Sequence, residues 1–231
     1  MKKALVLLIC AGSMFLAMGQ HPFVTNGAVI LKDREVEVEL SMWTGFYSEG
    51  AAGYGNVGVN TSYGAGDRFQ VGMGNYWYAR KSDHSDNGLT TPDVYMKFSV
   101  RPDLFTIKAF SLLNAEEFGA AFLYSYGLKK LEINTNLDLG FVSENGEDNA
   151  FTWAYSVVKP LNNWFFGAEI YGKAAGWMEK DAKKPFWQVG YGYTFPKRNS
   201  HTASLGFGGS FVSNNDLKIT LAMTWLGSGN K

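Results

Sequence analysis

Residues that could carry out catalysis are few in this sequence, and they do not form a complete catalytic set. The chain of 231 residues contains three histidines and one cysteine: His21, His84, His201 and Cys10. Only Ser82, Ser85 and Asp86, which lie close to His84 in the sequence, resemble the start of a nucleophile–base group. They belong to a polar stretch whose residue types are typical of a solvent-exposed turn. We therefore predict that the protein is not an enzyme and has no catalytic residues, no metal ligands and no cofactor.

The composition argues against several classes of binding protein. The 21 lysines and arginines balance the 21 aspartates and glutamates, so no strong field favours nucleic acid as a partner. Cys10 has no second cysteine with which to form a disulfide or to share a structural zinc ion. With 16% aromatic residues, the chain is also too aromatic for a disordered protein. What remains to be explained is where the charges lie along the chain.

The side chains alternate between apolar and polar along much of the sequence. From Leu131 to Phe141 every second residue is apolar or a threonine, and the residues between them, Glu132 to Gly140, are polar or glycine. Successive side chains of a strand point to opposite faces, so this period of two predicts a sheet with one apolar and one polar face. After residue 19 no apolar run reaches the roughly 18 residues that indicate a membrane-spanning helix.

The same alternation predicts strands of about the 9–11 residues that a tilted membrane-crossing strand needs, or slightly longer. The predicted ranges are 35–47, 53–63, 68–80, 93–101, 104–112, 118–126, 131–142, 151–159, 164–173, 186–195, 200–212 and 217–226. Short turn-rich links, such as 64–67 and 101–103, alternate with longer polar segments, such as 81–92 and 174–185. Tight periplasmic turns and long external loops are typical of outer-membrane barrels. The predicted fold class is therefore all-β: a transmembrane antiparallel β-barrel of about twelve strands, with both termini on the periplasmic side.

A water-soluble β-sandwich would also alternate apolar and polar residues. Bulky aromatic residues favour the barrel, because they gather on the apolar face near the predicted strand ends. They are Trp77, Phe151, Trp153, Tyr155, Trp164, Trp187, Tyr193, Phe195 and Trp225. Such rings suit the two membrane–water interfaces, and closure into a barrel leaves no unpaired edge strand.

The first residues have the pattern of an export signal. Met1-Lys2-Lys3 is positively charged, residues 4–18 are apolar, and Gly19 ends a small-residue cleavage site. A lipoprotein signal at Cys10 is disfavoured, because Ile9 is large and the apolar run before it is short. We predict a signal peptide at 1–19, an N-terminal periplasmic arm at 20–34, the barrel at 35–226 and a tail at 227–231. The predicted location is the bacterial outer membrane.

Three short motifs carry a family resemblance. They are residues 21–28 (HPFVTNGA) with 34–39 (REVEVE), residues 62–72 (SYGAGDRFQVG), and residues 160–164 (PLNNW) with 168–172 (AEIYG). They resemble the outer-membrane β-barrels named after the MetA pathway of phenol degradation. The resemblance implies transport of small aromatic or hydrophobic compounds and carries over no site residue. One departure is that Trp225 is followed by further residues, whereas outer-membrane strands usually finish on a terminal aromatic.

The polar face of the barrel would line its lumen. The candidate lining residues are Arg68, Tyr76, Tyr78, Arg80, Tyr95, Lys97, Lys108, Asp138, Glu169 and Tyr171. We expect Lys97 and Lys108 near mid-height on adjacent strands, with Asp138 and Glu169 around the other side. A basic wall facing an acidic wall would select polar solutes by orientation as well as by size. Alternatively, the charges pair with one another and brace a small barrel without transport.

We interpret the chain as an outer-membrane channel for passive uptake of small molecules. The family resemblance favours aromatic or hydrophobic solutes, whereas the lumen charges favour polar ones. The expected partners are outer-membrane lipid, a small-molecule solute and the barrel assembly machinery. Residues 20–34 would either plug the periplasmic mouth in part or extend the first strand, and the sequence leaves both open.

Overall fold

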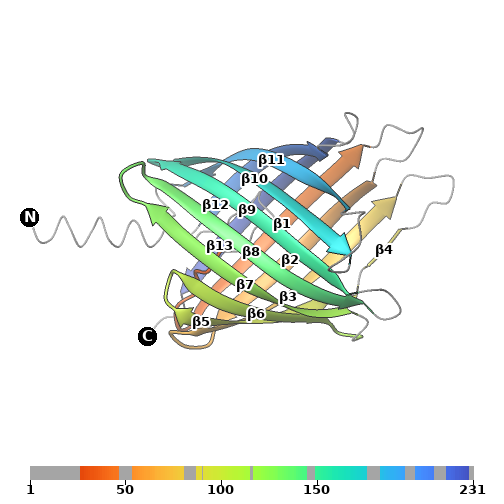
Figure 1. The fold of residues 1–231 in the computed structure, drawn as a ribbon, viewed down its shortest axis with the longest axis horizontal. Coiled ribbons are helices and arrows are strands. Elements are labelled where there is room, and N and C mark those ends of the chain that lie inside the picture. Colours follow the sequence, from red (N-terminus) through yellow and green to blue (C-terminus); the bar gives the residue numbers. More distant parts are fainter. Residues whose placement is uncertain are drawn as a thin grey trace, which may run out of the picture.

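The computed structural model describes residues 27–46, 54–80, 87–89, 91–114, 117–144, 149–175, 183–195, 201–210 and 217–228. These residues form one antiparallel sheet that closes on itself as a strongly tilted barrel (Figure 1). The strands are β1 (Glu35–Phe46), β2 (Tyr54–Gly64), β3 (Phe69–Arg80), β4 (Asn87–Leu89), β5 (Asp93–Arg101), β6 (Phe105–Leu112), β7 (Glu117–Leu128), β8 (Ile133–Glu144), β9 (Ala150–Leu161), β10 (Trp164–Ala175), β11 (Lys183–Thr194), β12 (His201–Ser210) and β13 (Leu217–Ser228).

Closure depends on the pairing of the first and last strands. β1 pairs with β13 from Glu35↔Ser228 to Phe46↔Leu217, and it pairs with β2 on its other side. Because β2 in turn pairs with β3, the long strands form a continuous ring without a free edge. The predicted fold class, an antiparallel barrel with about twelve wall strands, is confirmed.

One short strand was not predicted. β4 lies within the polar segment 81–92, which is predicted from the sequence to be a loop, and it pairs with β3 at Trp77–Ala79. Further along, β5 pairs with β3 at Phe69–Gly74, so β4 and β5 share one place in the ring. Pro92 lies just before β5, and proline has no N–H to donate to a ladder, which explains the interruption.

The two ends of the barrel differ in their connections. At the end where β1 begins and β13 ends, tight turns link the strands, and only Asn162 and Asn163 separate β9 from β10. We call this the tight-turn end. Four non-glycine residues near the strand starts and turns of this end have a positive φ, as tight turns often require: Arg34, Asp103, Glu132 and Asn162. The left-handed Glu132 also explains why β8 begins at Ile133 and not at the predicted Leu131.

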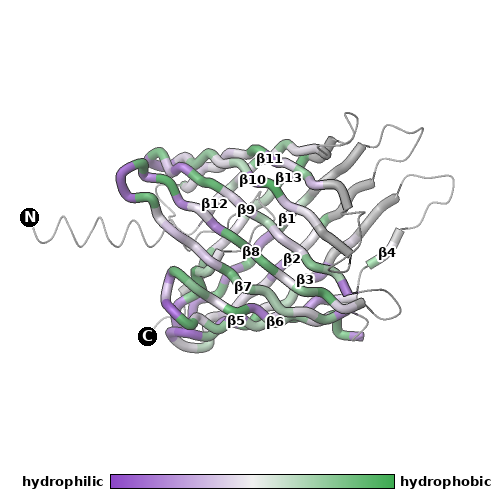
Figure 2. Tube along the Cα trace, viewed as in Figure 1, coloured by the Kyte–Doolittle hydropathy of each residue, from purple (hydrophilic) through white to green (hydrophobic). Residues whose placement is uncertain are grey.

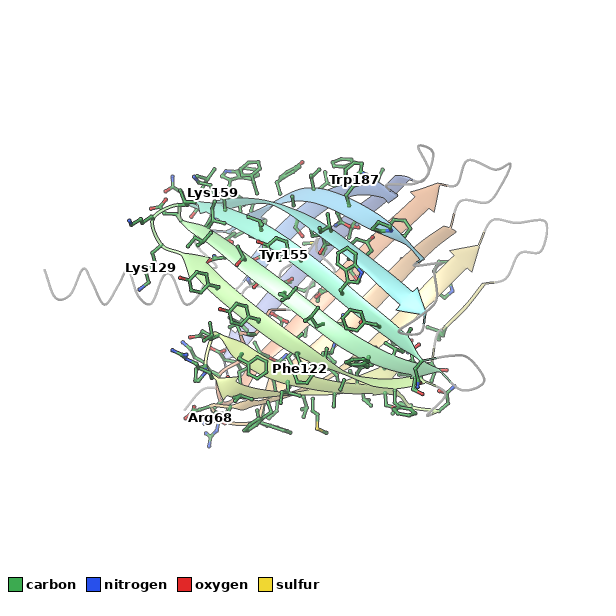
Figure 3. All side chains as sticks on the ribbon, in the orientation of Figure 1. Arg68, Phe122, Lys129, Tyr155, Lys159 and Trp187 are labelled. Atoms are coloured by element: carbon green, nitrogen blue, oxygen red, sulfur yellow. The ribbon has the colours of Figure 1, made fainter. Side chains whose placement is uncertain are left out.

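The outer surface of the barrel is an apolar belt. Side chains that point outward, such as Met42, Phe98 and Phe122, are 46–48% exposed. In Figure 3, Phe122 and Tyr155 point away from the wall, whereas Lys129 and Lys159 lie at the tight-turn end, where Figure 2 also shows hydrophilic turns. Soluble proteins rarely expose so much contiguous apolar surface, but a lipid-facing wall requires it. Among the described residues, no helix has the length and hydropathy needed to cross a membrane.

Candidate functional site

The inner face of the barrel is lined largely by polar side chains. They occupy alternate positions along the strands, as the period of two predicts. The buried members are Glu39, Ser41, Ser62, Gln70, Lys97, Ser99, Thr106, Ser125, Asn136, Ser156, Glu169, Gln188, Thr194, Thr202, Ser204, Thr220 and Thr224. Carboxylate, ammonium, amide and hydroxyl groups thus stand where a water-soluble protein of this size would have an apolar core.

Two lysines lie side by side near the middle of β5 and β6. Lys97 and Lys108 are direct partners in the ladder between these strands, and the Lys97 side chain is only 8% exposed. Both ammonium groups lie over the ring of Tyr95, with Nζ–centroid distances of 5.8 Å for Lys97 and 4.9 Å for Lys108. The Lys108 ammonium also lies 5.5 Å from the centroid of the Phe110 ring. The negative faces of these rings stabilise the two charges.

Carboxylates on strands to either side of this lysine pair attract it electrostatically. Lys97 interacts electrostatically with Glu37 and Glu39 of β1 and with Asp138 of β8. In the order of strands around the barrel, β1 is three places from β5, and β8 is two places from β6. These carboxylates therefore flank the lysines. Of the two acidic residues expected on the other side of the interior, Asp138 lies only two strands away, whereas Glu169 of β10 is four places from β6.

The row of residues next to the lysine pair is aromatic. In the ladder, Gly72 of β3, Tyr95 of β5, Phe110 of β6 and Gly119 of β7 follow one another as direct partners. A Cβ at either glycine would collide with the neighbouring ring. The glycines therefore let both rings lie close along the barrel wall.

Hydrogen bonds fix the Tyr95 ring in this position. The Tyr95 hydroxyl lies 2.6 Å from Ser62 Oγ and accepts a hydrogen bond of 3.2 Å from Gln70 Nε2. Gln70 in turn accepts a hydrogen bond of 3.0 Å at Oε1 from the backbone N–H of Leu31. The chain before β1 is thus linked to the aromatic row through Gln70.

Residues 27–31 enter the barrel at the tight-turn end and do not extend β1. The backbone N–H of Ala28 donates to Ser125 Oγ of β7 at 2.8 Å, and its carbonyl oxygen accepts a hydrogen bond from Thr106 Oγ1 of β6. Ala28 is fully buried and packs in an apolar cluster with Ala121 and Leu123 of β7. Of the two alternatives left by the sequence, the structure favours a partial plug. We call residues 27–31 the inner arm.

A chain of side-chain hydrogen bonds continues from the inner arm across the wall. Ser125 Oγ donates to Asn136 Oδ1 of β8 at 2.7 Å, and Asn136 Nδ2 donates to Ser156 Oγ of β9 at 3.2 Å. All three side chains are buried. The polar groups of Ser125, Asn136 and Ser156 are therefore satisfied by one another and by the inner arm.

The predicted lining residues fall into three groups. Inward positions on the described strands are held by Tyr95, Lys97, Lys108, Asp138, Glu169 and Tyr171. Arg68 was assigned to the lining wrongly: it lies in the turn before β3, is exposed, and points away from the barrel in Figure 3. The alternation of faces does not extend into the turn, because β3 starts only at Phe69. The side chains of Tyr76, Tyr78 and Arg80 lie outside the described part of the structure.

The remaining candidates from the sequence are the three histidines, of which His21 lies outside the described residues. The segment 81–86, with Ser82, His84 and Asp86, lies outside the described residues. His201 is on the outer face of β12, where its ring meets Trp225 edge-on at 6.5 Å.

Sequence reasoning missed the residues that anchor the inner arm and the aromatic row. Gln70, Thr106 and Ser125 occupy positions that the alternation predicts to point inward. Nothing in the sequence indicates that they form hydrogen bonds with Ala28 or Leu31. Gly72 and Gly119 could be assigned a role only once the register placed an aromatic residue directly beside each of them.

Comparison with known proteins identifies the fold. No protein-family model and no curated protein matches the sequence. The solved COG4313 outer membrane channel from Pseudomonas putida F1 is similar, with a TM-score of 0.60 and 11% identity over 89% of this chain and 100% of that chain. The KdgM porin has a TM-score of 0.56 and 9% identity over 81% of this chain and 98% of that one. The NanC porin has a TM-score of 0.54 and 13% identity over 80% and 98% of the two chains.

At this low identity the similarity concerns the fold alone. The chain has the fold of a bacterial outer-membrane β-barrel, and the predicted location in the outer membrane agrees with it. The resemblance to the MetA-pathway group is not confirmed by these comparisons and stays a prediction.

Proposed function

We propose that the protein is a passive channel that lets small polar molecules cross the outer membrane through the barrel interior. The observation that carries the proposal is the polarity of the inward face, where lysines, carboxylates, amides and hydroxyls line a barrel whose outside is apolar. Polar and charged linings of this kind are typical of barrels that hold water. The fold shared with solved outer-membrane channels supports the proposal.

In the wall across the barrel from the lysines, several described inward positions are held by small, uncharged residues. In the order of strands around the barrel, β11 and β12 are six places from β5 and β6. Their inward positions include Gly190, Gly192, Ser204, Gly206 and Gly208. Small side chains leave more of the interior to water, and a charged wall facing an uncharged one creates a transverse field that orients polar solutes.

The family resemblance and the charges of the inner face point to different classes of solute. The family resemblance implies small aromatic or hydrophobic compounds, and inward rings such as Tyr95 and Tyr171 could contact them. The charges of the same face favour polar solutes, because a purely apolar pathway would not require charged side chains on the inner face. Outer-membrane lipid would surround the apolar belt, and the barrel assembly machinery would insert the chain.

Planar-bilayer recording tests the channel. The purified protein should give discrete conductance steps, and replacing Lys97→Glu together with Lys108→Glu should shift the reversal potential towards stronger cation selectivity. Lys159→Glu, at an exposed position at the tight-turn end, is the matched control and should leave the reversal potential unchanged. Silent bilayers with correctly folded protein would instead support the alternative of a braced barrel without transport.

A further inference from the structure

We propose that Lys97 and Lys108 form a binding site for small organic carboxylates inside the barrel. The inference rests on the proposed channel for access to the site, and it names the class of solute. The first observation that supports the site is that placing two lysines side by side in the interior costs free energy. Like charges directly opposite each other in an antiparallel pair destabilise a sheet, and burying a charge without a close partner is costly. In the described part of the chain, neither ammonium group makes a salt bridge or a hydrogen bond.

The site is held in shape before any ligand arrives. The Tyr95 hydroxyl is hydrogen-bonded to Ser62 and Gln70. These bonds hold the Tyr95 ring in place next to both ammonium groups. Gly72 keeps this ring close to the barrel wall. A preorganised pair of cations costs little conformational entropy when it binds an anion.

A carboxylate matches this pair better than a monatomic anion such as chloride does. It offers two oxygen atoms on one carbon, and each can accept a charge-assisted hydrogen bond from one ammonium group. The groups that act on the pair from neighbouring strands are Glu37, Glu39, Asp93 and Asp138, and they limit its affinity for an anion. Weak, reversible binding is what a channel requires, because a solute must leave as readily as it enters.

Sodium acetate is the probe, because it is small and does not partition into detergent micelles. Saturation-transfer NMR on the refolded protein in detergent should show saturable binding in the millimolar range. We expect the dissociation constant to rise about tenfold or more in Lys97→Gln/Lys108→Gln, since two charge-assisted contacts are lost. Lys159→Gln, which removes a charge outside the barrel, should bind as the unmodified protein does. Lys97→Arg/Lys108→Arg should retain binding.

Three outcomes would overturn the site: no saturation, equal binding by the double glutamine variant, or displacement of acetate by chloride at equal concentration. The last result would indicate a site for any small anion. If the double variant does not fold, as judged by heat-dependent gel mobility, Lys108→Gln alone replaces it under the same criteria. Acetate binding with silent bilayers would contradict the channel and support the site. Conductance without acetate binding would contradict the site and leave the channel.

Discussion

At the level of single residues, glycines beside aromatic rings recur across the ladder. In each case the glycine and the aromatic residue are direct partners on adjacent strands, and a Cβ on the glycine would meet the ring. The pairs on the inner face are Gly72–Tyr95, Gly119–Phe110 and Gly192–Phe165. The missing side chain gives the ring room to lie along the wall, so that a bulky residue takes up little of the interior.

Replacing Gly72→Ala should force the Tyr95 ring away from the wall. The ring would lose its hydrogen bonds to Ser62 and Gln70 and swing into the interior. We expect the free energy of unfolding to fall by about 1–3 kcal/mol, the usual cost of overpacking, and the single-channel conductance to decrease. Denaturant titration in detergent and bilayer recording measure the two effects.

Gly127→Ala is the control for this change. Gly127 is also at an inward position of the barrel wall, but a Cβ there would meet only Asn134 Oδ1, at 3.5 Å. Its conductance should therefore equal that of the unmodified protein. Equal effects of the two variants would contradict the role assigned to Gly72.

Many of the inward-facing residues could be predicted from the alternation of side chains along each strand alone. Lys97, Lys108 and Glu169 lie on the predicted inner face because each occupies an alternate position of its strand. The prediction for Arg68 was wrong because side chains do not alternate between the two faces within a turn. The contact between Tyr95 and Gly72 could not be predicted, since it depends on the register between two strands, and register is set by contacts far apart in the sequence.

At the level of elements, the inner arm is the segment whose removal should change the channel most. Hydrogen bonds join it to β3, β6 and β7, and Arg34 continues the connection by donating its backbone N–H to Gly64 O at 2.8 Å. It therefore covers one side of the interior at the tight-turn end. A segment held at several points narrows the mouth without closing the barrel wall.

Thr106→Val together with Ser125→Ala should loosen the inner arm. Each substitution removes a hydrogen bond to Ala28, a loss of about 0.5–1.5 kcal/mol for each bond. We expect higher mean conductance and more current noise, because the arm would leave the mouth more often. Single-channel recording measures both quantities.

Thr135→Val is the control for the double variant of Thr106 and Ser125. Thr135 also donates a side-chain hydrogen bond near this end, to the carbonyl oxygen of Tyr126 at 3.1 Å, but on the other face of the wall. Its conductance should be unchanged. A double variant of Thr106 and Ser125 with unchanged conductance would show that the arm does not narrow the channel.

The elements of the wall could be predicted because alternation is a local signal. The order and approximate ranges of the long strands follow from it. The short strand β4 could not be predicted, since only three residues pair there. The place of the inner arm was also left open, because its contacts to β6 and β7 span 78 and 97 residues of sequence.

At the level of the whole molecule, one closed sheet has an apolar outer face and a polar inner face. The apolar belt needs lipid or detergent, and the polar interior needs water or bound solute. We expect the mature chain to refold to a heat-modifiable form in detergent and to aggregate in buffer alone. A monomer that stays folded and soluble in buffer, measured by sedimentation, would contradict the membrane-facing role of the belt.

Cysteine labelling tests most directly whether water reaches the inner face of the barrel and not its outer face. Cys10 is the only cysteine of the sequence and lies in the predicted signal peptide, so a mature chain carries no background thiol. Thr220 points inward on β13, and its neighbour Leu221 points outward. In lipid bilayers, a charged thiol reagent should modify the Thr220→Cys variant and reduce its conductance. The Leu221→Cys variant should react only with a lipid-soluble reagent. A folded Thr220→Cys variant that resists the charged reagent from both sides of the membrane would contradict the account.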